Sequence, residues 1–187
     1  MRLNEPRIAP VDLDTATDEQ RELLAPFADT LGILNIFRTM AHTPKALKRF
    51  NVWGGYVMGH GTSLTPRQRE IAILRTGWLC RAGYEWVQHR RIGEEAGLSA
   101  DEIAAIKIGP EDDRWSADER AILRATDELV ADHFVTDATW AALAPLGEKQ
   151  RMDLVYTVGQ YVLVSMLLNS FGVQLDAGQT LDADFPG

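Results

Sequence analysis

The stretch that decides the fold runs from residue 64 to residue 89. It begins Leu64-Thr-Pro-Arg-Gln-Arg-Glu-Ile-Ala-Ile-Leu-Arg75 and ends Cys80-Arg-Ala-Gly-Tyr-Glu-Trp-Val-Gln-His89. Its first half opens on Thr65-Pro66, and a proline in the first position of a helix loses no hydrogen bond. Apolar residues then recur at helical spacing until Gly83, and glycine commonly interrupts or ends a helix. The stretch therefore predicts two helices that meet near Gly83.

The rest of the chain carries the same kind of helix signal, and no convincing strand period of two residues is found. The segment from Glu148 to Ser170 is apolar over much of its circumference, as expected for a central or subunit-interface helix. Capping-box spacing, which marks helix starts, occurs at Thr17 with Gln20, Ser99 with Glu102, and Ser116 with Glu119. We predict an all-α, single-domain helical bundle of seven or eight helices, with no sheet.

Length and composition give the expected domain organisation. A chain of 187 residues with 45% hydrophobic content is near the usual size of one domain and can bury a sizeable core. Residues 1–16 contain prolines and little periodicity, so we expect an extended N-terminal segment on the surface. Residues 17–171 should form the helical domain. Residues 172–187, with Asp176, Asp182 and Asp184, are predicted to form a loose acidic C-terminal tail.

Charge and cysteine content limit the possible partners and compartments. The net charge of -8 argues against a nucleic-acid partner, because binding to a phosphate backbone needs a basic surface. A single cysteine cannot form an internal disulfide and suits a reducing, cytoplasmic environment. The longest apolar stretch, Leu154 to Leu168, is short for a bilayer, so we expect a buried helix and no membrane partner.

The sharpest chemical signal is the pair Glu85 and His89. Residues four apart share one face of a helix, so these two side chains can exchange a proton or address one ligand together. Glu70 belongs to the preceding helix and joins them only if the two helices pack antiparallel. The alternative is an exposed pair that limits fraying of the helix end. Six arginines and only two glutamates lie between residues 67 and 91, so this segment either attracts an anion or presents solvated surface charges.

Other kinds of site have little support in the sequence. His42, His60 and His133 are scattered, and no clustered ligand pattern indicates a metal. No glycine-rich phosphate loop is found, and Trp53-Gly-Gly-Tyr56 favours close helix packing or a bend. We therefore predict neither a metal nor a cofactor.

The residues from Leu64 to Ser99 resemble the carboxymuconolactone decarboxylase-like family, which also contains the alkylhydroperoxidase D proteins. The resemblance rests on Glu70, on Tyr84-Glu85-Trp86 and on His89, and it extends more loosely from about Asn35 to His133. It implies a helical bundle of the alkylhydroperoxidase D-like type. It also implies a homo-oligomer, a trimer or hexamer assembled through helical faces.

The peroxidase branch of this family uses a glutamate, a Cys-x-x-Cys pair and a histidine four residues beyond the second cysteine. Glu70 and His89 match the outer members, but the cysteine positions hold Ala82 and Glu85. Cys80 has no partner that could resolve a sulfenic acid, and on a continuous helix it would face away from His89. Cys80 is therefore either a buried structural residue or a redox thiol that works with an external thiol.

The decarboxylase branch of the family catalyses its reaction without the cysteine pair, and this chain resembles that branch more closely. The resemblance implies a cofactor-independent lyase acting on a small carboxylated lactone or a related intermediate of aromatic compound catabolism. Glu70, Glu85 and His89 would be catalytic. His89 would protonate carbon, Glu85 would orient His89 or tune its pKa, and Glu70 would complete the relay.

The same resemblance suggests substrate-binding residues, each of which also has a structural interpretation. Arg75 or Arg81 would hold the substrate carboxylate, although Arg81 could equally form a surface ion pair with Glu85. Tyr84 and Trp86 would line the pocket, or they would be core aromatics. The alternatives to a lyase are an alkylhydroperoxidase-like peroxidase that uses Cys80, and a family member that binds ligands without catalysis.

Overall fold

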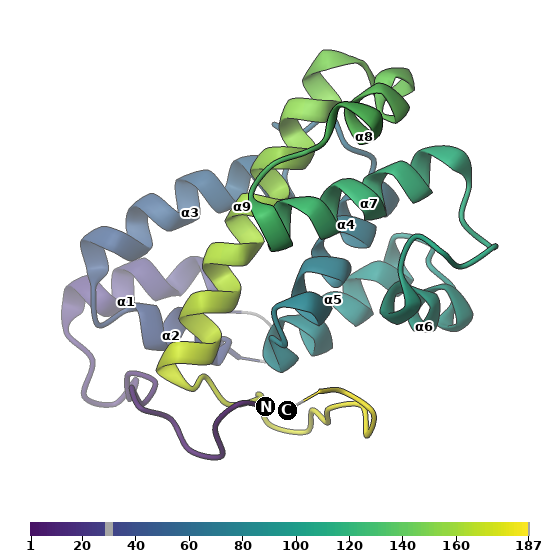
Figure 1. Cartoon of the computed structure of the whole chain (residues 1–187). Helices are drawn as coiled ribbons and strands as arrows, with labels where there is room; N and C mark the ends of the chain where they lie inside the picture. Colours follow the sequence, from purple (N-terminus) through teal and green to yellow (C-terminus); the bar gives the residue numbers. More distant parts are fainter. Residues whose placement is uncertain (29–31, 187) are drawn as a thin grey trace.

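The structure is a computed structural model that describes residues 1–28 and 32–186 (Figure 1). Within these ranges it contains helices and no strand, which confirms the all-α prediction. The helices are α1 (Asp18–Leu24), α2 (Asn35–Met40), α3 (Pro44–Met58), α4 (Pro66–Leu79), α5 (Gly83–Glu95), α6 (Ala100–Ile108), α7 (Ala117–Asp132), α8 (Asp137–Ala142) and α9 (Gly147–Phe171), with 3-10 turns η1 (Ala25–Phe27) and η2 (Ala144–Leu146). The described part has more helices than the seven or eight expected, because α1, α2 and α8 are only six or seven residues long.

Local sequence sets most of the helix starts. The three expected capping boxes are present, at Thr17, Ser99 and Ser116. Thr65 forms a fourth with Gln68, and Pro66 occupies the first turn of α4. In each box the side chains satisfy backbone N–H groups that have no partner inside the helix.

Helices α4 and α9 form the centre of the bundle. Residues Glu70–Gly77 of α4 are all buried, and α4 packs against α5, α6, α7 and α9. In Figure 1, α9 crosses the molecule with α1–α3 on one side and α4–α7 on the other. Among the described residues, Ala144–Phe171 is the one stretch long and apolar enough to span a bilayer. Its contacts with α3, α4, α5 and α7 place it inside the bundle.

A tight turn over residues 80–82 joins α4 to α5. Arg81 takes the left-handed conformation with φ 52°, and the backbone N–H of Ala82 donates to the carbonyl of Gly77 at 2.8 Å. Gly83 is the first residue of α5. The prediction that two helices meet at this glycine is therefore confirmed.

The C-terminal segment is not the loose tail that its composition suggested. Phe185 is buried and packs edge-on against Trp78, with ring centroids 5.3 Å apart. Asp176 accepts hydrogen bonds from Tyr84 and Gln88, and Asp182 accepts one from the indole N–H of Trp86. The acidic residues of this segment therefore bind donors on α5, and the segment completes the bundle. Figure 1 shows the two ends of the chain close together beside it.

Replacing Phe185 with alanine should test this attachment. Because Phe185 is only 7% exposed, Phe185→Ala should lower the free energy of unfolding by about 3 kcal/mol, measured by urea denaturation. Phe134 is 59% exposed, so Phe134→Ala is the matched control and should change stability by less than about 0.5 kcal/mol. Equal effects of the two variants would contradict the packed position of the C-terminal segment.

Candidate active site

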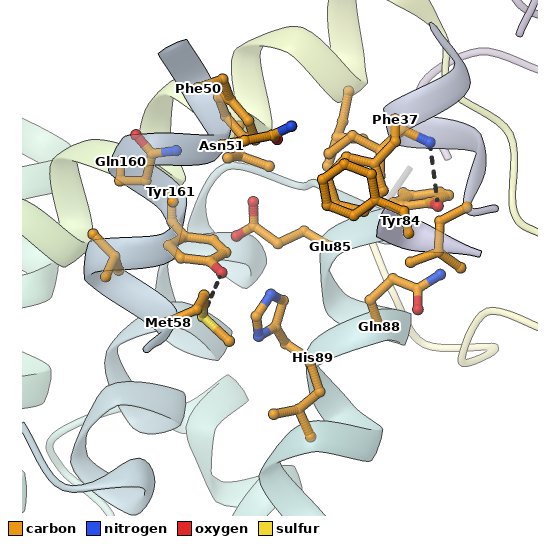
Figure 2. A pocket seen from close by; sticks show the side chains of 18 of the residues that line it. Phe37, Phe50, Asn51, Met58, Tyr84, Glu85, Gln88, His89, Gln160 and Tyr161 are labelled. Carbon is orange, nitrogen blue, oxygen red and sulfur yellow. Dashed lines mark hydrogen bonds between the residues drawn. The ribbon is translucent and has the colours of Figure 1, made fainter. Parts of the chain in front are cut away.

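A cavity of about 390 Å³ lies among α2, α3, α5 and α9 (Figure 2). Its wall is mostly apolar and aromatic, with Phe37, Phe50, Tyr84 and Tyr161 among the lining residues. Helix α5 supplies its polar side. Glu85, Gln88, His89 and Ile92 recur at helical spacing and so share one face of α5.

His89 is held in place by Glu70 from the neighbouring helix. Nδ1 of His89 lies 2.7 Å from Oε2 of Glu70, so the imidazole donates to the carboxylate. Glu70 is fully buried, and its other oxygen accepts from Nε of Arg69 at 2.9 Å. The His89 ring also meets Tyr161 edge-on at 4.8 Å. Nε2 of His89 has no hydrogen-bond partner among the described residues, so this nitrogen remains available to a ligand.

Glu85 borders the same cavity but has a different environment. It is 2% exposed, and its Oε2 accepts from the Ser165 hydroxyl at 3.0 Å. Oε1 has no partner within the described ranges. It lies against Gly77, where a Cβ would come within 2.9 Å of it, so a larger residue at this position of α4 would require the Glu85 carboxyl to move. Burial, reinforced by the charge of Glu70, raises the pKa of Glu85 well above its ordinary value and favours the protonated acid.

The antiparallel packing of α4 and α5 therefore brings Glu70, Glu85 and His89 together. Figure 2 shows Glu85 and His89 pointing into the same space beside Tyr161. The alternative of an exposed pair is wrong, because both residues are buried. Glu85 was expected to orient His89, but the structure shows that Glu70 makes this contact.

Neither arginine expected to bind a carboxylate lines the cavity. Arg75 is buried elsewhere, where its Nε and Nη2 donate to Asp127 at 2.6 and 2.9 Å and its Nη1 donates to the carbonyl of Ile106. Arg81 lies in the turn between α4 and α5. Its expected ion pair with Glu85 is absent, because Glu85 is buried and bonded to Ser165.

The two aromatic residues expected to line the pocket, Tyr84 and Trp86, have different positions. Tyr84 lines the cavity, and its hydroxyl donates to Asp176 at 2.6 Å. Trp86 does not line it. It is fully buried, with its ring against Trp78 and Phe185. Trp86 is therefore a core residue.

Cys80 caps the C-terminal end of α4 and is not among the residues that line the cavity. Partial burial raises the pKa of its thiol. A raised pKa lowers the thiolate fraction and so disfavours nucleophilic or redox chemistry at this sulfur. Within the described residues, no group of three or more His, Cys, Asp or Glu side chains is arranged to hold a metal ion.

Several cavity residues were missed by sequence reasoning. Gln160 and Tyr161 come from α9, and Phe37 and Phe50 come from α2 and α3. Ser165 of α9 does not line the cavity but donates to Glu85. The available signal was the presence of polar side chains within the apolar segment 148–170. A polar group on a helix that is buried on most sides must find a partner inside the protein.

Comparison with known proteins agrees with this architecture. Residues 44–128 match the family model described as the Carboxymuconolactone decarboxylase family. The chain is therefore similar to this family over a little less than half of its length. The matched residues include Glu70, Glu85 and His89, whereas the cavity residues from α2 and α9 lie outside the match. No curated protein sequence matches the chain.

Solved structures of similar fold extend over nearly the whole chain. The alkylhydroperoxidase AhpD core, an uncharacterized peroxidase-related protein from Ralstonia eutropha JMP134, has a TM-score of 0.80 at 20% identity and covers 92% of this chain and 93% of its own. An uncharacterized peroxidase-related protein from Silicibacter sp. TM1040 has a TM-score of 0.77 at 14% identity, covering 99% and 97%. A variant of the debrominase Bmp8 in complex with 2,3,4-tribromopyrrole has a TM-score of 0.72 at 14% identity, covering 93% and 94%. At these identities the likeness shows a shared fold.

The raised pKa of Glu85 predicts a pH dependence of stability for this protein. Because the folded pKa lies above the unfolded value of 4.5, Glu85 stabilises the fold fully below that value and loses this contribution as pH rises. Glutamine cannot ionise. We expect the stability of the wild type relative to Glu85→Gln to fall as the pH rises above about 4.5 in urea denaturation. A difference that stays constant with pH would contradict the protonated, buried state.

Proposed function

We propose that this protein is a cofactor-independent lyase that acts by acid–base chemistry on a small carboxylated ring compound. A carboxylated lactone or a related intermediate of aromatic compound breakdown fits this description. The supporting observation is the pairing, beside one apolar cavity, of a buried Glu85 that has an unpartnered oxygen with a His89 held by Glu70. The match of residues 44–128 to the carboxymuconolactone decarboxylase family supports the same class of reaction.

The proposed reaction needs three things from the protein. When the bond from the ring to the carboxylate breaks, carbon dioxide leaves and the electron pair passes into the conjugated carbonyl of the ring. Nε2 of His89 stabilises the charge that develops on that oxygen, and Glu70 stabilises the imidazolium form. Glu85, protonated because it is buried, delivers a proton to carbon and is reprotonated from solvent afterwards.

The shape and lining of the cavity suit a planar ring. Its volume of about 390 Å³ is in the range of small-molecule sites, and aromatic side chains form much of its wall. The debrominase Bmp8 has a similar fold, and its complex holds 2,3,4-tribromopyrrole, a small aromatic ring. This likeness supports a ring compound as the ligand here.

A thiol peroxidase is less well supported. Cys80 lies outside the cavity lining, has no second cysteine and has a raised pKa. A ligand-binding protein without catalysis would use the same cavity, so turnover decides between that possibility and a lyase.

The lyase proposal predicts a specific ranking of variants. In an assay of carbon dioxide release from a panel of carboxylated lactones, His89→Gln and Glu85→Gln should each lower kcat by about 10²- to 10⁴-fold. Cys80→Ser should retain activity and is the matched control. Thermal unfolding should show that all three variants are folded.

Three outcomes would reject the lyase mechanism. The first is full activity in Glu85→Gln, and the second is loss of activity in Cys80→Ser alone. The third is saturable binding of the lactones by the wild type with no product formed, which would leave a binding protein.

We also propose that the chain is cytoplasmic and assembles with copies of itself into a trimer or hexamer. Met152, Tyr156, Leu163 and Met166 form an exposed apolar stripe along α9. Their spacing of three, four or seven residues is that of a helix face that packs against another helix. Trp53 of α3 is also exposed, and its ring meets that of Tyr156 with centroids 5.5 Å apart, so it widens the patch.

This assembly is testable by chromatography with light scattering. The wild type should elute as an oligomer at micromolar concentration, and Met166→Glu should shift it toward the monomer, because a buried unpaired charge is costly. Ile108 is 63% exposed on α6, away from the stripe, so Ile108→Glu should leave the mass unchanged. A wild-type monomer would overturn the proposal.

A further inference from the structure

Arg91 is the only lysine or arginine among the described residues that line the cavity. It lies on α5, two residues after His89 and six residues after Glu85. Its side chain is 57% exposed, so the guanidinium stands at the open end of the cavity, where solvent reaches it.

Arg91 forms an ion pair with Glu95 that a ligand could replace. Nη1 of Arg91 pairs with Glu95 at 2.7 Å, one helical turn further along, and the Glu95 side chain is 62% exposed. An ion pair this exposed contributes little to stability, because water screens both charges. A ligand carboxylate could therefore replace Glu95 at small cost.

The other arginines of this basic segment do not line the cavity, and several of them are bound elsewhere. Arg69 is bound to Glu70 and to the carbonyl of Met58, and Arg75 is bound to Asp127. Arg90 pairs with Asp182 of the C-terminal segment. The positive charge seen in the sequence is therefore mostly used inside the protein, and Arg91 is the part of it that reaches the cavity.

We propose that Arg91 recognises the carboxylate of the ligand and sets its orientation. The inner part of the cavity is mostly apolar, and the Glu70 carboxylate lies behind His89, so a fully charged anionic group would lose its hydration there and is disfavoured. Six residues of α5 separate Glu85 from Arg91, which corresponds to about 9 Å along the helix axis. That length accommodates a single ring, with its anionic group at Arg91 and its uncharged part against the aromatic wall. This inference takes the cavity of the proposed function as the ligand site, but it does not depend on turnover.

Binding of two matched probes tests the role of Arg91. Benzoate carries a carboxylate, and benzamide has the same shape without the charge. In NMR titrations, Arg91→Gln should weaken benzoate binding by about tenfold and leave benzamide binding unchanged, since only the charge-assisted contact is removed. Glu95→Gln should tighten benzoate binding by about twofold, because it removes the competing carboxylate.

Arg90→Gln is the matched control for long-range electrostatics. It removes an equal charge from the adjacent residue, which does not line the cavity, and should change benzoate affinity by less than about twofold. The inference is overturned if Arg90→Gln and Arg91→Gln weaken benzoate equally, if Arg91→Gln weakens both probes equally, or if the wild type binds neither probe. If benzoate binds through Arg91 and no lactone is decarboxylated, the proposed function fails and the role of Arg91 stands.

Discussion

The contact between Glu70 and His89 connects the fold of this protein to its chemistry. Glu70 is fully buried in the central helix α4, and a buried carboxylate is costly unless it is paired. Arg69 and His89 satisfy its two oxygens, and His89 does so from the neighbouring helix α5. The same contact therefore fixes the packing of the two helices and the direction of the imidazole, so a change that separates the helices also disorganises the site.

Two carboxyl groups so close together differ because their environments differ. Glu70 has a cation and an imidazole as partners, whereas Glu85 has only the hydroxyl of Ser165. Burial therefore raises the pKa of Glu85 and favours its protonated form. Separate environments of this kind let two similar side chains act as acid and as charged partner at one pH. Gly77 contributes by leaving room for the Glu85 carboxyl against α4.

The C-terminal segment binds side chains of α5 and connects α5 to α2. Asp176 bonds to Tyr84 and Gln88, both of which line the cavity, and to the backbone N–H of Asn35 at the start of α2. The Asp176 carboxylate therefore connects α5 and α2, the helices that form two walls of the cavity. Composition alone predicted a loose acidic tail, because its donors lie more than eighty residues away in sequence and leave no local signal.

What the sequence determined by itself was local. Capping boxes at Thr17, Ser99 and Ser116, proline at helix starts and apolar spacing along α4 and α9 act within a few residues, so they predicted the helices and the all-α class. The helical spacing of Glu85 and His89 also placed both on one face of α5. Tertiary structure decided which side chains share a cavity. Packing alone places Glu70 against His89 and Arg75 against Asp127, because each of these contacts joins residues of different helices. Packing also decides that Arg91 lies at the opening of the cavity, because this depends on which face of α5 is covered.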